Sequence, residues 1–398
     1  MIRARHFAIA GIITIVGLIA WLNWPTDRQS AQENSIKVLR QSWKSYKDTF
    51  IHEGGVVRLK EQDTVSEGMA YAMMRSLWMD DKEVFDQLYE WSEKNLSRLE
   101  HGGDHLLSWR WAKGATLDSM PASDADIDYG FSLLFAAHKW PDQNPRHLMT
   151  YQEKARRVLS DILEKETVRL DDGRLYLTPW ILTVDEKLAD KILLNPSYYS
   201  PAFFRLFYEF SKDIRWSELI NTSYYLLLKA QSQIGNKEGV GFIPDWVDVS
   251  RSGEFFMNDE KGAMSSWEAV RIPLRIAFDY YWFQSSEAKQ FFKANSNFIK
   301  HLEKTWRSKN RIESEYGYSG VANNSFENAL FYASYYVSTE IANSPISDDI
   351  YVRLHYLSKA SEEDFSYGDN NDYYVNSLAW MADGFRSGLL SKHPFTGD

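Results

Sequence analysis

A helical periodicity that recurs along almost the whole chain constrains its fold more than any other feature. From Ile36 onward, apolar residues return at spacings of three and four in about twelve segments, as expected of helices that bury one face. These segments begin near Ile36, Glu67, Lys82, Asp124, His147, Ser200, Trp216, Ser265, Ser286, Ser325, Ser347 and Tyr373. No alternating pattern is long enough for a sheet domain, and only residues 173–178 fit a short strand pair. About a dozen helices can close as hairpins into an inner and an outer ring, so the sequence predicts an all-α domain.

The N-terminus has the features of a membrane anchor. Arg3 and Arg5 precede an apolar run from Phe7 to Trp24, and no charged residue follows until Asp27. The length of this run is near the lower limit for a helix that crosses a bilayer. Positive charge before the run predicts that the N-terminus is cytoplasmic and that the rest of the chain lies outside.

A cleaved signal peptide is the alternative interpretation of the same segment. Such a peptide needs small residues at the cleavage site, whereas residues 22–25 read Leu-Asn-Trp-Pro. We therefore expect an uncleaved anchor over residues 1–25, a linker over residues 26–33 and one extracytoplasmic domain over residues 34–398. Cleavage would instead release a secreted form.

The composition excludes several classes of protein and cofactor. The formal net charge is −10 and no long run of Lys and Arg occurs, which argues against a nucleic-acid binder. A negative chain also repels polyanions, so a neutral or cationic polymer is the favoured substrate. The absence of cysteine excludes disulfides, zinc–thiolate sites and iron–sulfur clusters. The nine histidines show no ligand spacing, and we expect neither a metal nor another cofactor.

Three acidic residues stand where predicted helices begin: Glu67, Asp124 and Glu268. Each has a purely structural explanation, because acids favour the first turn of a helix. The local patterns also resemble capping boxes, namely Thr64-x-x-Glu67, Ser123-x-x-Asp126 and Ser265-x-x-Glu268.

The same acids also suit the hydrolysis of a glycosidic bond. This reaction needs one protonated carboxyl group and a second, ionised one. Glu67 has few cationic neighbours in the sequence, which suits an acid whose pKa is raised by an apolar setting. Arg271 follows Glu268 by three residues, so it can share a helix face and hold that carboxylate ionised. The residues therefore favour Glu67 as acid and Glu268 as base.

At these positions the chain resembles glycoside hydrolase family eight, which includes cellulases, lichenases, xylanases, chitosanases and the cellulase of bacterial cellulose-synthesis operons. Residues 64–71, Thr-Val-Ser-Glu-Gly-Met-Ala-Tyr, are similar to the T-x-S-E-G-x-x-Y block, whose Glu is the proton donor. Residues 122–126, Ala-Ser-Asp-Ala-Asp, are similar to the A-S/T-D-A/G-D signature, whose first Asp contacts the sugar at the cleavage point. Residues 267–275 resemble the Y-D-A-x-R-x-P-x-R block, and residues 195–199 and 243–247 resemble further family segments.

The resemblance runs from about Ile36 to about Leu390 and implies an (α/α)6 barrel, an inverting mechanism and no cofactor. One departure concerns packing, since Tyr129 and Gly130 replace the usual aliphatic residue and Ala. The other concerns chemistry, because Glu268 stands where the family's usual base is Asp. Three alternatives stay open: Asp245 or Asp248 as the base, or a weak enzyme that mainly binds glycan.

Aromatic residues make up 15% of the chain, with 15 Trp and 23 Tyr, which suits a sugar-stacking cleft as well as an aromatic core. The candidate substrate contacts are Asp126, Trp109, Trp111, Tyr198, Trp246 and Arg271. We expect a monomeric catalytic domain that cuts a β-1,4-linked polysaccharide internally at the cell surface. A cellulose-like exopolysaccharide is favoured over xylan or chitosan.

Two rivals from other classes fit less well. A polysaccharide lyase would need a groove rich in Lys and Arg, and a structural single-span membrane protein leaves the three motif blocks unexplained.

Overall fold

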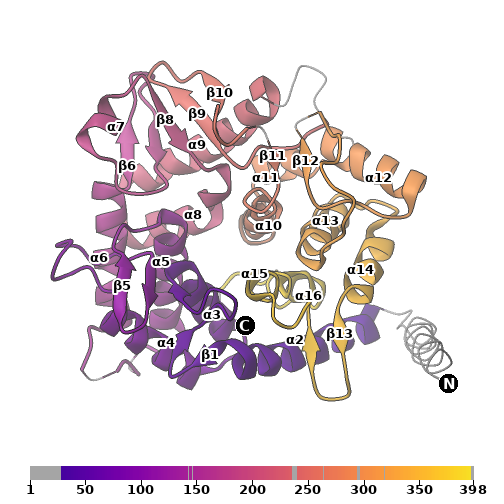
Figure 1. Ribbon diagram of the computed structural model, residues 1–398, viewed down its shortest axis with the longest axis horizontal. Coiled ribbons are helices and arrows are strands. Elements are labelled where there is room, and N and C mark those ends of the chain that lie inside the picture. Colours follow the sequence, from indigo (N-terminus) through magenta and orange to yellow (C-terminus); the bar gives the residue numbers. More distant parts are fainter. Residues whose placement is uncertain are drawn as a thin grey trace.

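The computed structural model describes residues 28–141, 143–145, 147–234, 240–262, 264–293, 296–317 and 319–395. Within these residues the fold is mainly helical, as the periodicity predicts (Figure 1). The anchor predicted for residues 1–25 lies outside the described residues. Among the described helices, none combines the length and the apolar character needed to cross a membrane.

An inner ring of helices surrounds the centre of the molecule. Its members are α3 (Ser66–Trp78), α5 (Ser123–Lys139), α8 (Pro201–Ser211), α10 (Arg271–Phe283), α13 (Ala329–Ile341) and the pair α15 (Tyr373–Leu378) and α16 (Met381–Arg386). Each packs on the next, and α15 packs on α3, so the ring closes. Nearly every residue of α3, α5, α10 and α13 is buried, which is why their sequences lack a polar face.

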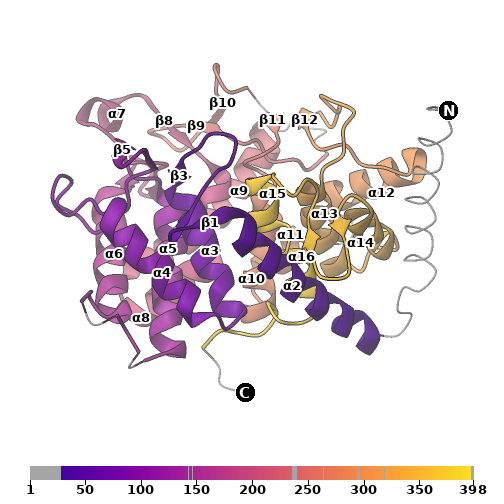
Figure 2. The ribbon, with the colours of Figure 1, turned by 60° about the horizontal axis from the view of Figure 1, so that its bottom comes forward.

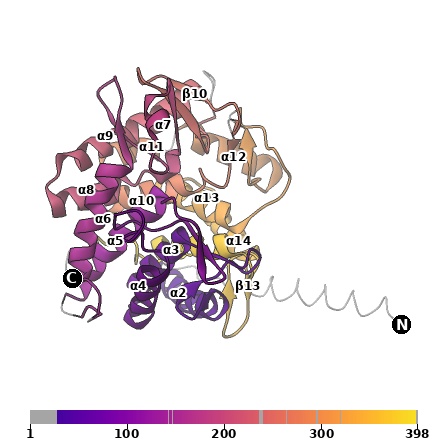
Figure 3. The same ribbon diagram turned by 60° about the vertical axis from the view of Figure 1, so that its left-hand side comes forward.

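A second ring lies outside the first. It contains α2 (Arg28–Phe50), α4 (Lys82–Asn95), α6 (Tyr151–Lys165), α9 (Ile214–Lys229), α11 (Ser286–Phe291), α12 (Asn297–Lys309) and α14 (Ser347–Tyr356). Helices α4, α6, α9 and α14 pack on α3, α5, α8 and α13, and α2 packs on α16. Figure 3 shows α3 and α10 enclosed by α4, α9 and α12. The two rings agree with the expected barrel, and the outer helices bury one face each.

Short strands gather at one end of the barrel, where α3, α5 and α10 begin (Figure 2). One sheet joins β3 (Thr64–Val65), β4 (Arg110–Ala112) and β5 (Ala115–Asp118); another joins β8 (Lys191–Leu194), β9 (Val247–Ser250) and β10 (Phe255–Met257). Two-stranded pairs are β1 (Ile51–His52) with β2 (Gly55–Val56), β6 (Thr167–Arg169) with β7 (Leu175–Leu177), β11 (Met264–Ser265) with β12 (Tyr316–Gly317), and β13 (Lys359–Ala360) with β14 (Phe365–Ser366). Strand β7 lies within the predicted pair at residues 173–178, but its partner is β6. We call this end the mouth.

The capping boxes predicted at the three acids do not form. The N-cap residues of α3 and α5 are Val65 and Ala122, and neither has a side-chain cap hydrogen bond. Backbone and side-chain contacts with other segments hold these helix starts instead, such as Ser66 N to Trp109 O at 2.9 Å and Ser123 Oγ to Thr178 O at 2.7 Å. The carboxyl groups of these acids therefore do not cap the helices at the mouth.

Two local predictions are corrected by the structure. Helix α2 already begins at Arg28, so residues 28–33 are helical rather than a linker, because Gln, Ala and Glu favour helix even without an apolar stripe. Helix α10 begins at Arg271, so Glu268 lies in the turn before the helix and not within it.

Candidate active site

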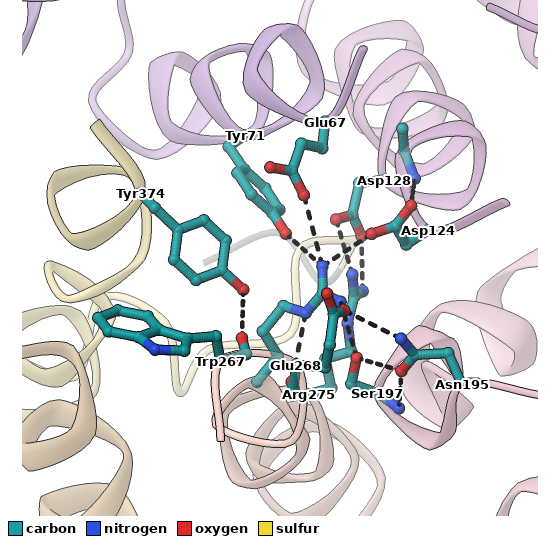
Figure 4. Close-up of polar contacts among 12 residues, drawn as sticks. Glu67, Tyr71, Asp124, Asp128, Asn195, Ser197, Trp267, Glu268, Arg275 and Tyr374 are labelled. Carbon is teal, nitrogen blue, oxygen red and sulfur yellow. Dashed lines mark hydrogen bonds and ion pairs between the residues drawn. The ribbon is translucent and has the colours of Figure 1, made fainter. Parts of the chain in front are cut away.

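A single guanidinium, that of Arg271, contacts all three predicted carboxylates, and Figure 4 shows Glu67, Asp124 and Glu268 converging on one point. Its Nη1 lies 2.7 Å from Asp124 Oδ2 and 3.5 Å from Glu67 Oε2. Its Nη2 donates to Glu268 Oε2. Residues 67, 124 and 271 come from the first turns of three inner helices, which converge at the mouth. The barrel thus assembles one polar cluster from segments about 200 residues apart.

Further partners fix the arginine in place. Arg271 is 2% exposed, and it also donates to Tyr71 Oη at 3.1 Å and to Ser197 Oγ at 2.8 Å. One turn deeper, Arg275 forms a bidentate pair with Asp128 at 2.7 and 2.9 Å. Arg271 and Arg275 are four residues apart on α10, and their partners Asp124 and Asp128 are four residues apart on α5. The two ion pairs therefore fix how α10 lies against α5.

The three carboxyl groups receive unequal stabilisation from the arginine. Burial raises the pKa of Glu67 to about 8, the charges of Asp124 and Glu268 add to this, and Arg271 opposes it. With this pKa, the Glu67 carboxyl group is mostly protonated at neutral pH. A general acid needs this protonation state.

An open groove of about 1740 Å³ exposes Glu67 and Glu268 together. Its lining is Arg58, Leu59, Lys60, Glu61, Glu67, Trp267, Glu268, Asp369, Asn371, Asp372, Tyr373 and Tyr374. The Tyr374 hydroxyl donates to the Trp267 carbonyl at 2.8 Å, which ties α15 to the turn that carries Glu268. The groove therefore presents both candidate catalytic groups to the same ligand.

An aromatic row leads away from the arginine. The ring of Tyr198 lies 5.1 Å from the Arg271 guanidinium. The ring of Trp246 lies 6.1 Å from Tyr198 and 6.4 Å from Trp180. The sequence predicted Tyr198 and Trp246 as sugar contacts, whereas Trp180 had no recognisable signal.

The two other candidate tryptophans lie on strand β4 or beside it. Trp111 pairs with Thr64 of β3, and its ring packs edge-on against Trp91 at 5.1 Å. Trp109 is 38% exposed and accepts the Ser66 N–H through its carbonyl at 2.9 Å. Because β3 runs directly into the helix start that holds Glu67, both tryptophans lie on the acid's side of the mouth.

Asp126 does not face the groove, contrary to the predicted substrate contact. It is fully buried, and its Oδ1 accepts the Leu107 N–H at 2.8 Å. Burial raises its pKa well above the ordinary value. Asp126 thus anchors the segment before β4, while Asp124 points to the arginine.

The alternative bases serve the structure of the mouth. Asp245 Oδ1 accepts the backbone N–H groups of Ser266 and Ala269 at 2.8 Å each, and its Oδ2 accepts the Ser266 hydroxyl. Asp248 accepts Asn258 Nδ2 at 2.9 Å within the β9–β10 pair. Asp245 therefore holds the turn that carries Glu268, and Glu268 has the better placement for the base.

Sequence reasoning assigned no role to Asn195, Ser197 or Tyr71, because only the tertiary structure brings them to the arginine. In the part of the chain that the structure describes, no group of three or more His, Asp or Glu side chains is arranged to hold a metal ion.

A closed helical barrel with a raised-pKa carboxyl group and a second carboxyl group in one open groove defines the class of carboxylate glycosidases. The model of "Glycosyl hydrolases family 8" matches residues 12–388, and the chain belongs to this family. The expected resemblance is confirmed.

Known proteins show the same relationship. Endoglucanase 2 of Ruminiclostridium josui is 28% identical over 285 residues, which cover 69% of this chain and 56% of that protein. The reducing end xylose-releasing exo-oligoxylanase of Halalkalibacterium halodurans is 28% identical over 234 residues, 56% of each chain. The β-1,3-1,4-glucanase structure from Paenibacillus sp. X4 has a TM-score of 0.74 and 19% identity, covering 92% of this chain and 94% of that one. The chain thus spans little more than half of these curated relatives, and the solved structure shows the shared fold.

Proposed function

We propose that this protein is an endo-acting, inverting glycoside hydrolase of a β-1,4-linked polysaccharide, with cellulose-like glucan as the favoured substrate. The observation that carries the proposal is the pairing of Glu67 and Glu268 on one guanidinium within an open groove. Family membership supports the reaction class, and a relative named as an endoglucanase supports the glucan. An open groove suits attack within a long chain.

In the proposed reaction, Glu67 gives its proton to the oxygen of the leaving sugar as the glycosidic bond breaks. Glu268 takes a proton from a water molecule, whose oxygen bonds to the anomeric carbon from the opposite face. The configuration at this carbon inverts. We expect Asp124, which lies 2.7 Å from Arg271, to contact the sugar at the cleavage point, as the family resemblance implies.

Both donors to Glu268 bind the same oxygen. Arg271 Nη2 and Asn195 Nδ2 donate to Oε2, which leaves Oε1 for the water. Inverting enzymes keep their two carboxyl groups roughly 6.5–9.5 Å apart to make room for this water. Glu268 lies in the turn before α10, and its side chain reaches one methylene further than the Asp usual in the family.

We further propose that residues 1–25 anchor the protein in a membrane, with the domain outside the cytoplasm. Helix α2 begins at the end of the barrel opposite the mouth and runs toward it (Figure 2). With 23 residues it is about 35 Å long. An anchor that precedes Arg28 would therefore hold the groove on the side away from the bilayer, open to an external polymer.

The test is a digestion panel with a fragment that keeps α2 whole. Carboxymethyl cellulose, mixed-linkage glucan, xylan and chitosan are incubated with wild type and with Glu67→Gln, and product anomers are followed by NMR. We expect α-configured reducing ends from a β-glucan, with a fast fall in viscosity, and neither in the variant. Activity on xylan or chitosan alone would overturn the glucan, and glycan binding without reducing ends would favour a binding protein.

A further inference from the structure

A closed ring of hydrogen bonds joins Glu268 to three neighbours, Arg271, Ser197 and Asn195 (Figure 4). Arg271 Nη2 donates to Glu268 Oε2 and, at 2.8 Å, to Ser197 Oγ. Ser197 Oγ donates to Asn195 Oδ1 at 2.7 Å. Asn195 Nδ2 closes the ring with a hydrogen bond of 2.9 Å to Glu268 Oε2. Asn195 and Ser197 are 1% and 0% exposed.

The direction of each bond follows from the chemistry of the groups. A guanidinium only donates, so the Ser197 hydroxyl accepts from Arg271 and directs its own hydrogen to Asn195 Oδ1. The Ser197 backbone N–H donates to the same Oδ1 at 3.0 Å. Two donors on one oxygen settle which end of the amide is which. The Asn195 NH2 group must therefore point at the carboxylate of Glu268.

We propose that Asn195 is a positioning residue for the catalytic base, and that Ser197 sets the orientation of its amide. Together with Arg271 they hold Oε2 of Glu268 and direct Oε1 to the attacking water. Glutamate has one more rotatable bond than the aspartate usual in the family, and two hydrogen bonds to a single oxygen remove that freedom. The ring thus lets a glutamate serve as base; this inference rests on the proposed function.

Besides Asn195 and Ser197, several charged or titratable groups interact with Glu268 and can influence its response to pH. They are Arg271 on α10, Glu67 on α3, Asp245 before β9, Tyr198 in the 3-10 turn Pro196–Tyr198 and Tyr374 on α15. A test must therefore change Asn195 or Ser197 and leave these groups in place.

Asn195→Asp is such a change, since the carboxylate keeps the acceptor for both Ser197 donors and so keeps the cap of the 3-10 turn. It loses the donor to Glu268 and adds a like charge. A hydrogen bond to a charged group is worth enough to lower kcat by about 10- to 100-fold, with KM within about threefold. The acidic limb of the kcat/KM profile moves to higher pH, because the charged base loses a donor.

The matched control is Asn258→Asp, which introduces the same change beside Asp248 in the β9–β10 pair and should leave the pH profile in place. Ser197→Ala keeps the backbone donor and should cost less in kcat than Asn195→Asp. A carboxyl ¹³C NMR titration, in which the Glu268 signal is assigned with Glu268→Gln, measures the effect of the ring on Glu268 independently of catalysis. The Glu268 midpoint should move to higher pH in Asn195→Asp.

An unchanged midpoint together with an unchanged pH profile would overturn the inference. A shifted midpoint in a protein that releases no reducing ends would instead reject the proposed function while the ring retains its effect on Glu268.

Discussion

Glu67 Oε2 lies 3.5 Å from Arg271 Nη1, the longest of the three contacts that join a carboxylate to this guanidinium. Burial, followed by the charge of Asp124, raises the pKa of Glu67 to about 8, and this long contact with Arg271 opposes the rise. A carboxyl group that is buried and weakly paired keeps its proton, whereas one in close contact with a guanidinium is favoured in its charged form. The role of Glu67 as the acid thus follows from its burial together with its long contact with the arginine.

The first prediction concerns the alkaline limb of the pH–rate profile. Burial raises the pKa of Glu67 to about 8, and the acid works only in its protonated form. Activity should therefore fall as the pH rises through about 8, as measured by kcat/KM on the preferred polymer between pH 5 and 10. Glu67→Gln should lose about 100-fold or more in kcat. A profile that stays level to pH 10 would exclude Glu67 as the acid.

The second prediction tests Glu268 as the base. Glu268→Ala should lose about 100- to 10,000-fold in kcat, and sodium azide should restore turnover by replacing the activated water. The product would be a glycosyl azide of inverted configuration, identified by NMR. Asp245→Ala serves as the comparison, since its defect in the turn cannot be repaired by a nucleophile. Azide rescue of Asp245→Ala instead would transfer the base role to that residue.

The third prediction concerns the length of the base. Glu268→Asp restores the residue type usual in the family, but its shorter arm withdraws from Asn195 and Arg271. We expect kcat to fall by about tenfold, because hydrogen bonds to a charged group are lost. The initial rate of reducing-end release measures this effect. A variant faster than wild type would show that the ring does not depend on the longer side chain.

The fourth prediction links Asp245 to stability. Burial raises the pKa of this carboxyl group from 3.8 to about 6, against the hydrogen bonds from Ser266 and Ala269. The stabilisation from its protonated form is complete below about pH 3.8 and is lost as the pH rises through about 6. Asparagine at this position cannot ionise. The free energy of unfolding of Asp245→Asn should therefore rise relative to that of wild type as the pH increases from 4 to 7. Urea unfolding curves that differ by a constant offset over this range would contradict the assignment.

The fifth prediction concerns the aromatic row. Trp246→Ala should raise KM for long oligosaccharides by about 2- to 10-fold, the range expected for one lost ring contact, and should change kcat little. Substrates too short to reach this ring should be cut as by wild type. Equal effects on short and long substrates would place Trp246 outside the path of the glycan.

Much of the fold follows from local sequence. Apolar residues at three- and four-residue spacing predict the helices, and α4, α11, α14 and α15 begin at the predicted residues Lys82, Ser286, Ser347 and Tyr373. Their starts depend on neighbours within one turn, as with the Asp81 and Ser285 caps. The start of α10 was missed because Asp245, which lies far from it along the chain, binds the N–H groups of the turn before it.

The sequence alone determined the helical class, the three acids and Arg271, since these depend on periodicity and on short motifs. Only the tertiary structure decided which acids meet Arg271. Asp124 and Asp126 are two residues apart, and this separates them by about 200° around a helix, so Asp124 meets Arg271 whereas Asp126 accepts the Leu107 N–H. Asn195 meets Glu268, and Ser197 meets Arg271, from more than 70 residues away. The resemblance of residues 195–199 to a family segment marks them, but only closure of the helical barrel creates these contacts.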